Sequence, residues 1–194
     1  MYHPESTSET ESSVFTFQIT GRSRGQLGTP LDGRYGAMVP AQLRSAIAKL
    51  IPRVNLEGVD YIIGIPEGGL IPAYEFAVSS NIKLVLASHS QPAAPGFIRF
   101  IEPHMHADSC NNYVYGLKSG DKVVVVEDEV TTGATMSNCV TALRNAGVIC
   151  NDVVSIYAAD DASMLARLRA ENIQLHYLWN FSKKTVDDLY QKHE

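Results

Sequence analysis

The chain has 194 residues, of which 45% are hydrophobic and 8% aromatic, and its formal net charge is −5. This length suits one globular domain with a sizeable core, and the composition is that of an ordinary α/β protein. The negative charge disfavours a nucleic-acid binder that relies on a positive field. No apolar run is long enough to span a membrane. Three cysteines without a CxxC pair favour a reduced, cytoplasmic protein.

The beginning of the chain differs from the rest. Residues 1–13 are rich in Ser, Thr and Glu, which predicts a disordered tail, and they lack the apolar segment of a secretory signal. Residues 14–194 are expected to form a single domain. It opens with a short strand over Val14–Ile19 and a loop over Gly21–Gly36 that is dense in glycine and arginine.

From residue 40 onward, helical spacing and apolar runs alternate. In chain order they predict a helix from Pro40 to Pro52, a buried strand over Tyr61–Ile65, a helix over Ile71–Val78, a second buried strand over Ile82–Ala87, a central strand over Val123–Val126, a helix over Ala134–Ala146, a strand over Val153–Tyr157, a helix over Ala162–Glu171, a strand over Ile173–Trp179 and a short helix over Thr185–Gln191. This alternation predicts an α/β fold with a doubly wound, mostly parallel sheet flanked by helices.

One stretch interrupts the alternation. Ser88–Leu117 contains Pro92, Pro95 and Pro103 and has little periodicity. It is therefore predicted to be a long loop, and loops of this length are usually functional or mobile.

The most informative motif follows the run Val123–Val126. Two carboxylates, Glu127 and Asp128, come first, and a helix begins a few residues later. Between them is a turn of small and hydroxyl-bearing residues, Thr131, Thr132, Gly133, Ala134 and Thr135. Unpaired N–H groups and the dipole of a helix N-terminus favour a phosphate at such a turn. The carboxylates suit ribose hydroxyls, hydrated Mg²⁺ or a developing cation, so the motif predicts a phosphorylated sugar as ligand.

This motif resembles the phosphoribosyl-pyrophosphate (PRPP) site of the type I phosphoribosyltransferases. The resemblance implies that Glu127 and Asp128 are catalytic, face the ribose hydroxyls and stabilise an oxocarbenium-like transition state. It also implies that Thr131–Thr135 binds the 5′-phosphate. Mg²⁺ is expected as cofactor, held mainly through substrate and water near the two acids. The alternative is a plain strand followed by a helix cap, with surface acids.

A second glycine-rich turn follows the predicted strand Tyr61–Ile65. Gly68 and Gly69 permit backbone geometries that other residues avoid, and Glu67 precedes them. The segment looks like the pyrophosphate loop of the same family, which implies substrate binding by Glu67, Gly68 and Gly69 and an unusual peptide bond at Glu67. A tight turn that needs glycine only for packing is the alternative.

The long loop departs from the family pattern. Orotate phosphoribosyltransferases usually begin it with adjacent Arg and Lys residues, but this chain has Ser88-His89-Ser90-Gln91. Arg99 is then the candidate catalytic cation for pyrophosphate, with a solvated loop arginine as the alternative. His104 and His106 fit surface histidines better than a metal pair, because no third ligand is evident.

Two further segments bear on the acceptor base. The segment from Phe15 to Ser23 is similar to the opening of orotate phosphoribosyltransferases, where it forms a small N-terminal hood, and Arg22 could meet a carboxylate or phosphate there; a basic surface turn is the alternative. After Tyr157 this chain has two alanines and an acid pair in place of the orotate enzymes' Asp-Arg. Asp160 could accept hydrogen bonds from the base.

The resemblance covers residues 15–180 and implies a Mg²⁺-dependent pentosyltransferase. PRPP and a nucleobase-like acceptor are the expected substrates, and pyrophosphate is the leaving group. Orotate ranks first among acceptors because of the N-terminal segment, followed by purines and unusual biosynthetic acceptors. A non-catalytic regulator that senses PRPP or a nucleotide is the alternative function. The expected partners are these small molecules and a second copy in a homodimer, with no nucleic acid and no membrane.

Overall fold

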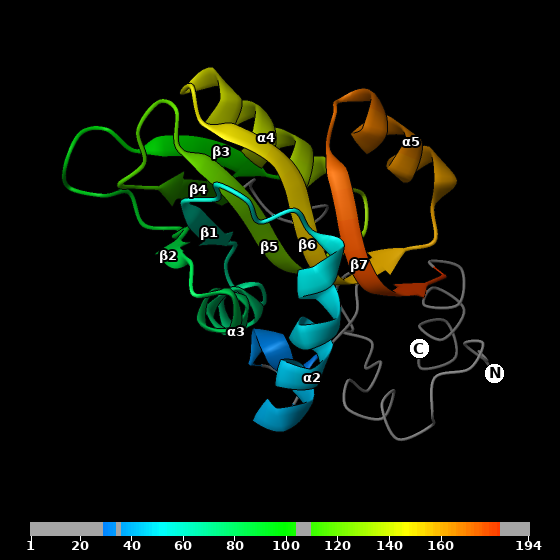
Figure 1. Ribbon diagram of the computed structural model, residues 1–194. Coiled ribbons are helices and arrows are strands. Elements are labelled where there is room, and N and C mark those ends of the chain that lie inside the picture. The colour runs from blue at the N-terminus through cyan, green and yellow to red at the C-terminus, as the bar shows by residue number, and fades with distance from the viewer. Residues whose placement is uncertain (1–28, 34–35, 104–109, 183–194) are drawn as a thin grey trace.

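The structure is a computed structural model and describes residues 29–33, 36–103 and 110–182. Its elements in chain order are the 3₁₀ turn η1 (Pro30–Asp32), α2 (Pro40–Leu50), the 3₁₀ turn η2 (Ile51–Arg53), β1 (Tyr61–Gly64), α3 (Leu70–Ser80), β2 (Lys83–Leu86), β3 (Ile98–Glu102), β4 (Cys110–Val114), β5 (Lys122–Val130), α4 (Ala134–Asn145), β6 (Ile149–Ala159), α5 (Ala162–Ala170) and β7 (Gln174–Phe181). Figure 1 shows a twisted sheet with helices above and below it. No helix in this described part of the chain is long and apolar enough to cross a membrane.

The main sheet has the strand order β2-β1-β5-β6-β7, and every neighbouring pair is parallel. Numbered by their own succession, these strands lie in the order 2-1-3-4-5, which is a doubly wound arrangement. The predicted fold class is confirmed. In such sheets the order reverses at one point, here between β1 and β5. The carboxyl ends of the strands on either side of that point form a crevice in which ligands bind.

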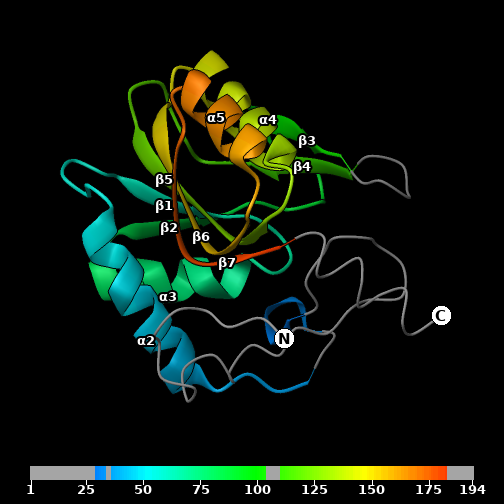
Figure 2. The same ribbon diagram turned by 90° about the vertical axis from the view of Figure 1, so that its right-hand side faces the viewer.

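Helices cover both faces of the sheet. Figure 2 shows α2 and α3 on one side and α4 and α5 on the other. The valines from Val123 to Val126 are fully buried in the central strand β5, as expected for a parallel strand that is covered on both faces. In α2, residues Leu43, Ala46, Ile47 and Leu50 recur at helical spacing and are the buried ones.

Two strand predictions need correction, one for β2 and one for β5. The run Ile82–Ala87 was expected to be a buried strand, but β2 is an edge strand, and Leu86 is 50% exposed. An apolar run alone does not distinguish an edge strand from an internal one. The central strand is also longer than predicted. Glu127 and Asp128 lie within β5 rather than after it, because pairing with β6 continues to Val130.

The stretch Ser88–Leu117 is not one long loop. Within it β3 and β4 pair antiparallel and form a two-stranded ribbon. Phe100 and Val114 are buried, the ribbon packs against α4, and Asn138 Nδ2 donates to the carbonyl of Ile101 at 2.8 Å. Each strand has only five residues, so its alternation gave too weak a signal beside the nearby prolines.

Several predictions lie outside the described residues. These are the tail 1–13, the strand Val14–Ile19 with the hood, the terminal helix Thr185–Gln191, and the candidate residues Arg22, His104 and His106.

Candidate functional site

The two predicted phosphate segments meet where the strand order reverses. The N–H of Ile65 donates to the carbonyl of Val126 at 3.1 Å, so the turn after β1 continues alongside β5. A Cβ built on Gly68 would overlap the Asp128 carboxylate, with Oδ1 only 2.6 Å away. A Cβ on Gly69 would lie 2.8 Å from Glu127 Oε1. Glycine is therefore required by close approach, and the acids and the glycine turn form one site.

Glu127 is held below this turn in a dry environment. Its side chain is 8% exposed, and its Oε1 accepts the N–H of Asp128 at 3.0 Å. Burial, followed by the charge of Asp128, raises the pKa of Glu127 well above its usual value. Glu127 therefore keeps a proton to higher pH than a surface glutamate does. A cationic ligand beside it would favour the ionised form.

A third carboxylate and a tyrosine extend the acid pair along the sheet. Glu129 follows on β5 and pairs in register with Tyr157 of β6, which pairs in turn with Trp179 of β7. The two rings stack at 5.5 Å between centroids. Burial, with the charges of Asp128 and Glu129, raises the pKa of Tyr157, so its phenol stays neutral. The sequence analysis missed this row, although Glu129 was visible as a third consecutive acid.

The turn after β5 leaves helix amides available. Gly133 caps α4 in the left-handed conformation, with φ of 71°, and adds no side-chain acceptor. The hydroxyl of Thr132 accepts the N–H of Ala134 at 3.3 Å. Gly69 likewise caps α3 without a side-chain acceptor, whereas α5 is capped by the carboxylate of Asp161. Neither glycine cap supplies a side-chain acceptor, although Thr132 takes the first N–H of α4 and the carbonyl of Glu67 takes the first N–H of α3. The remaining first-turn N–H groups can meet an anion.

Arg167 of α5 was not predicted as a site residue. Its Nη2 donates to the carbonyl of Thr132 in the predicted phosphate turn. Met164 and Leu168 are the buried residues of α5, and Arg167 lies one residue before Leu168. No motif in the sequence marks this arginine, because the contact depends on how α5 packs.

The other candidates have different placements. The peptide bond between Pro66 and Glu67 is cis, as predicted, and the side chain of Glu67 is exposed. Asp160 is exposed directly after β6, and its N–H donates to the carbonyl of Phe181 at 2.7 Å. Arg99 lies on β3 with an exposed side chain. Within the described residues, the structure shows no hydrogen bond or ion pair between Arg99 and Glu127 or Asp128.

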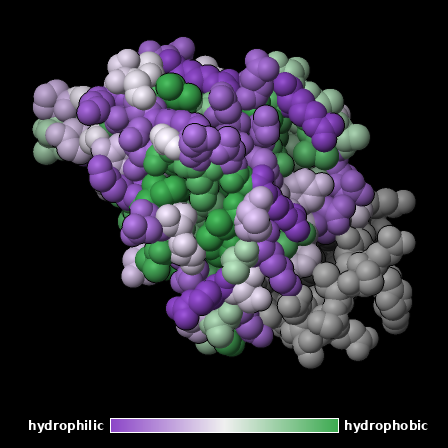
Figure 3. Space-filling view, viewed as in Figure 1, coloured by the Kyte–Doolittle hydropathy of each residue, from purple (hydrophilic) through white to green (hydrophobic). Residues whose placement is uncertain are grey.

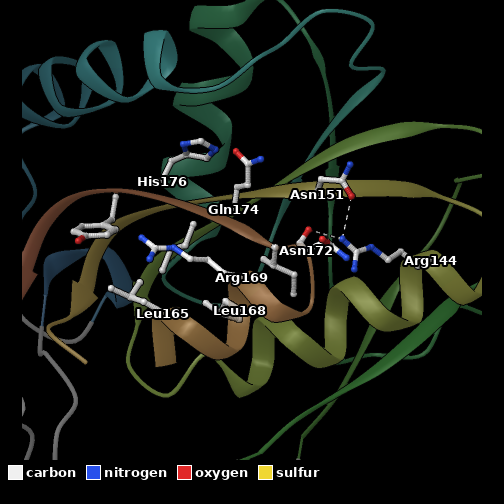
Figure 4. A pocket seen from close by; sticks show the side chains of 11 residues that line it. Arg144, Asn151, Leu165, Leu168, Arg169, Asn172, Gln174 and His176 are labelled. Atoms are coloured by element: carbon white, nitrogen blue, oxygen red, sulfur yellow. Dashed lines mark hydrogen bonds between the residues drawn. The ribbon is translucent and has the colours of Figure 1, made fainter. Parts of the chain in front are cut away.

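A second hollow lies along the outer strand β7, next to α5 (Figure 4), with a volume of about 880 Å³. Its most buried cation, Arg144, donates to the carbonyls of Cys150, Glu171 and Asn172 at 2.7–2.9 Å and to Asn151 Oδ1 at 3.0 Å. These bonds hold the loops around β7 together. They use the guanidinium for structure, and the acid pair lies elsewhere in the sheet.

The site fits a substrate-held magnesium ion better than a protein cage. Among the described residues, no group of three or more His, Cys, Asp and Glu side chains could enclose a metal ion. Mg²⁺ commonly uses only one or two carboxylates and takes its other ligands from substrate phosphates and water. Asp128, whose carboxylate lies against Gly68, can serve in that way.

The fold and this site define a doubly wound α/β protein with carboxylates and glycine turns at the crevice where the strand order reverses. The model of the phosphoribosyl transferase domain matches residues 40–189. The chain therefore belongs to the phosphoribosyltransferase family, and the predicted family is confirmed.

The chain is similar in sequence to hypoxanthine/guanine phosphoribosyltransferases and in structure to an adenine phosphoribosyltransferase. A hypoxanthine/guanine phosphoribosyltransferase of Ferroglobus placidus is 28% identical over 163 residues, which cover 82% of this chain and 86% of that protein. A similar enzyme of Methanocaldococcus vulcanius is 24% identical over 136 residues, 70% and 74% of the two chains. The adenine phosphoribosyltransferase structure of Rhodothermus marinus, 17% identical, covers 89% of this chain and 97% of its own with a TM-score of 0.71, which supports the fold.

Proposed function

We propose that this protein transfers phosphoribose from PRPP to a nitrogen of a purine-type base and releases pyrophosphate. The observation that carries the proposal is the direct contact between Gly68-Gly69 and Glu127-Asp128. It provides, side by side, bare amides for pyrophosphate and carboxylates for the ribose.

In the proposed reaction the bond from ribose C1 to pyrophosphate breaks, a bond from C1 to the base nitrogen forms, and that nitrogen gives up its proton to solvent. As the first bond breaks, positive charge develops on the sugar, and Asp128 stabilises it while Glu127 orients the hydroxyls. The turn Thr131–Thr135 holds the 5′-phosphate. When bound, Mg²⁺ would neutralise the leaving pyrophosphate. The backbone N–H of Glu67 and the guanidinium of Arg99 remain proposed contacts of pyrophosphate.

A purine-type base, rather than orotate, is the proposed acceptor. The hypoxanthine/guanine enzymes among the relatives support it. The residues after β6 agree, because the exposed Asp160 is a poor partner for the carboxylate of orotate and a good acceptor for ring or amino N–H groups. Arg22, which orotate binding would use, remains a proposed contact outside the described residues. Asp160 is the proposed base-selecting residue.

The test is an assay for pyrophosphate release. Hypoxanthine, guanine, adenine, xanthine and orotate would be offered separately with PRPP and Mg²⁺, and the nucleotide product identified by mass spectrometry. We expect turnover with a purine and none with orotate. PRPP binding in calorimetry without release for any base would support the regulatory alternative, which the exposed position of Arg99 favours.

A homodimer is part of the proposal, and α3 offers the surface for it. Ile71, Tyr74 and Val78 are 44%, 58% and 58% exposed and recur at the spacing of one helical stripe. Leu86 on the neighbouring strand β2 is 50% exposed. Figure 3 shows apolar surface around β1, β2 and α3 with a hydrophilic margin. A second copy brings the same neutral stripe and can bury it symmetrically.

Sedimentation equilibrium tests this surface. The wild type should have twice the chain mass of 21.2 kDa, and Tyr74→Glu should dissociate it. Ile149→Glu, at a 47% exposed site on β6, should leave the dimer intact. The three free cysteines are consistent with the cytoplasm as the proposed location.

A further inference from the structure

Arg167 reaches the proposed phosphate turn from outside the motif. Its Nη2 donates to the carbonyl of Thr132, and the same nitrogen lies 3.4 Å from the position of a Cβ built on Gly133. Met164 Cγ and Leu168 Cδ1 lie 3.2 and 3.3 Å from that position. Residues three and four apart share one helix face, so α5 packs its apolar side on Gly133 and brings the guanidinium to the turn with it.

The start of α5 is firmly anchored, which fixes where Arg167 can reach. Asp161 Oδ1 accepts the N–H groups of Ser163 and Met164 at 2.9 and 3.0 Å and the hydroxyl of Ser163 at 2.6 Å. A side-chain cap of this kind stabilises the first turn of a helix. The arginine is therefore presented by a rigid element rather than by a loop.

The negative charge around the turn gives a cation such as Arg167 importance for phosphate binding. The chain carries a net charge of −5, and three consecutive carboxylates, Glu127 to Glu129, lie in the last part of the central strand, shortly before the turn. A phosphate placed there needs a local cation. A guanidinium has five N–H donors, and among the described residues the acceptor that the structure assigns to Arg167 is the single carbonyl of Thr132.

We propose that Arg167 binds the 5′-phosphate of PRPP together with the amides and hydroxyls of Thr131–Thr135. This inference rests on the proposed function, because it assigns a further residue to the same substrate. The carbonyl of Thr132 holds one edge of the guanidinium at the turn, and its other N–H groups meet the phosphate. Arginine suits this task because its planar fork matches phosphate oxygens.

The chain offers a matched control two residues away. Arg169 is on the same helix and equally exposed, but it lines the hollow along β7. Figure 4 shows it among the side chains of that hollow. Replacing either arginine removes one positive charge from α5, so the difference between the two variants isolates the position.

The experiment measures binding of ribose 5-phosphate and of pyrophosphate, each with Mg²⁺, by calorimetry. Arg167→Ala and Arg167→Gln should weaken ribose 5-phosphate about 10-fold or more, the effect of one charge-assisted hydrogen bond, and leave pyrophosphate nearly unchanged. Arg169→Ala should match the wild type with both probes. Added salt should weaken ribose 5-phosphate less in Arg167→Gln than in the wild type.

The salt dependence distinguishes phosphate binding from a structural role, because a variant that only distorts the turn would lose affinity but keep the wild-type salt dependence. Wild-type affinity in Arg167→Gln would overturn the proposal, and so would an equal loss for both probes or for Arg169→Ala. If the wild type binds pyrophosphate but not ribose 5-phosphate, the 5′-phosphate assignment fails. If it binds neither probe, the proposed function fails as well. Thermal melting checks that each variant is folded.

Discussion

Two regions of this molecule are candidates for ligand binding, and they differ in shape and in chemistry. Along β7 there is a hollow of about 880 Å³ with two arginines and a histidine. At the carboxyl ends of β1 and β5 there are acids and glycines in direct contact. In Figure 4, His176 and Gln174 point to one side of β7, and Leu165, Leu168 and Arg169 lie on the other. The hollow is thus a groove around a sheet edge.

The difference lies in what the polar groups already do. Arg144 is fully engaged by carbonyls around β7, His176 Nε2 lies 2.8 Å from Asp152 Oδ1, and Arg53 donates to the carbonyl of Tyr177 at 2.6 Å. These bonds join the edge strand β7 and the loops beside it to neighbouring segments. At the other region, two helices begin with glycine caps that supply no side-chain acceptor, so part of their first-turn N–H groups stay available. Available donors and the sheet order therefore locate a site better than volume does.

The largest effect is expected from Gly68→Ala. The new methyl group would overlap and displace the Asp128 carboxylate and distort the turn as well, so turnover should fall by about 1,000-fold or more, and the melting temperature should drop by several degrees. Steady-state kinetics and a thermal melt measure the two effects.

Gly58→Asn provides the control, because Gly58 has open space around it and a φ of 70° that asparagine tolerates. Near-normal kinetics in Gly68→Ala would show that the glycine turn and the acids are not one site.

Asp128→Asn should come next, with turnover reduced about 100- to 1,000-fold and PRPP affinity changed far less. The amide keeps the shape of the carboxylate but loses the charge that stabilises the developing cation. Turnover and PRPP dissociation constants measured separately test this split. Glu57→Gln, an exposed acid before β1, is the control. Normal turnover in Asp128→Asn would remove the electrostatic role.

Glu127→Gln should have a smaller effect, on the free energy of unfolding, and this effect should depend on pH. The native pKa of Glu127 is raised above the ordinary value of 4.5, so the folded protein holds this proton more tightly than the unfolded chain does. The free energy of unfolding of the wild type should then fall as pH rises from 4.5 through the native pKa. The variant, which cannot ionise, should therefore be more stable than the wild type at pH 8.

Urea unfolding of both proteins between pH 4 and pH 8 measures this difference. It should vanish below pH 4, where the glutamate is protonated in both states. A difference that stays constant across the range would mean that Glu127 is not held in a desolvated environment.

The smallest kinetic effect is expected from Arg144→Ala. Loss of its bonds around β7 should lower the free energy of unfolding by about 2 kcal/mol, and the KM for PRPP should stay within about twofold because the groove takes no part in binding. Urea unfolding and steady-state kinetics give both values. A large rise in KM would make the groove part of the site after all.

The fold was predictable from the alternation of helical and apolar patterns after residue 40, and the site from the motif at Glu127–Thr135. The ribbon β3–β4 was not, because two short strands covered on one side leave only a weak pattern. The edge position of β2 depends on strand order, which a local run does not contain. Arg167 and the row from Glu129 to Trp179 depend on packing between segments far apart in the chain.

The missing side chain at Gly68 has a consequence for how this protein can change over time. Any bulkier residue there would force the Asp128 carboxylate to move or to be replaced by a shorter group, and either change would take the charge away from where the proposed chemistry requires it. The two positions are therefore tied to each other. A substitution at one position is tolerated only if the other loses its proposed role, so relatives without this Gly–Asp pair should lack the proposed transferase activity.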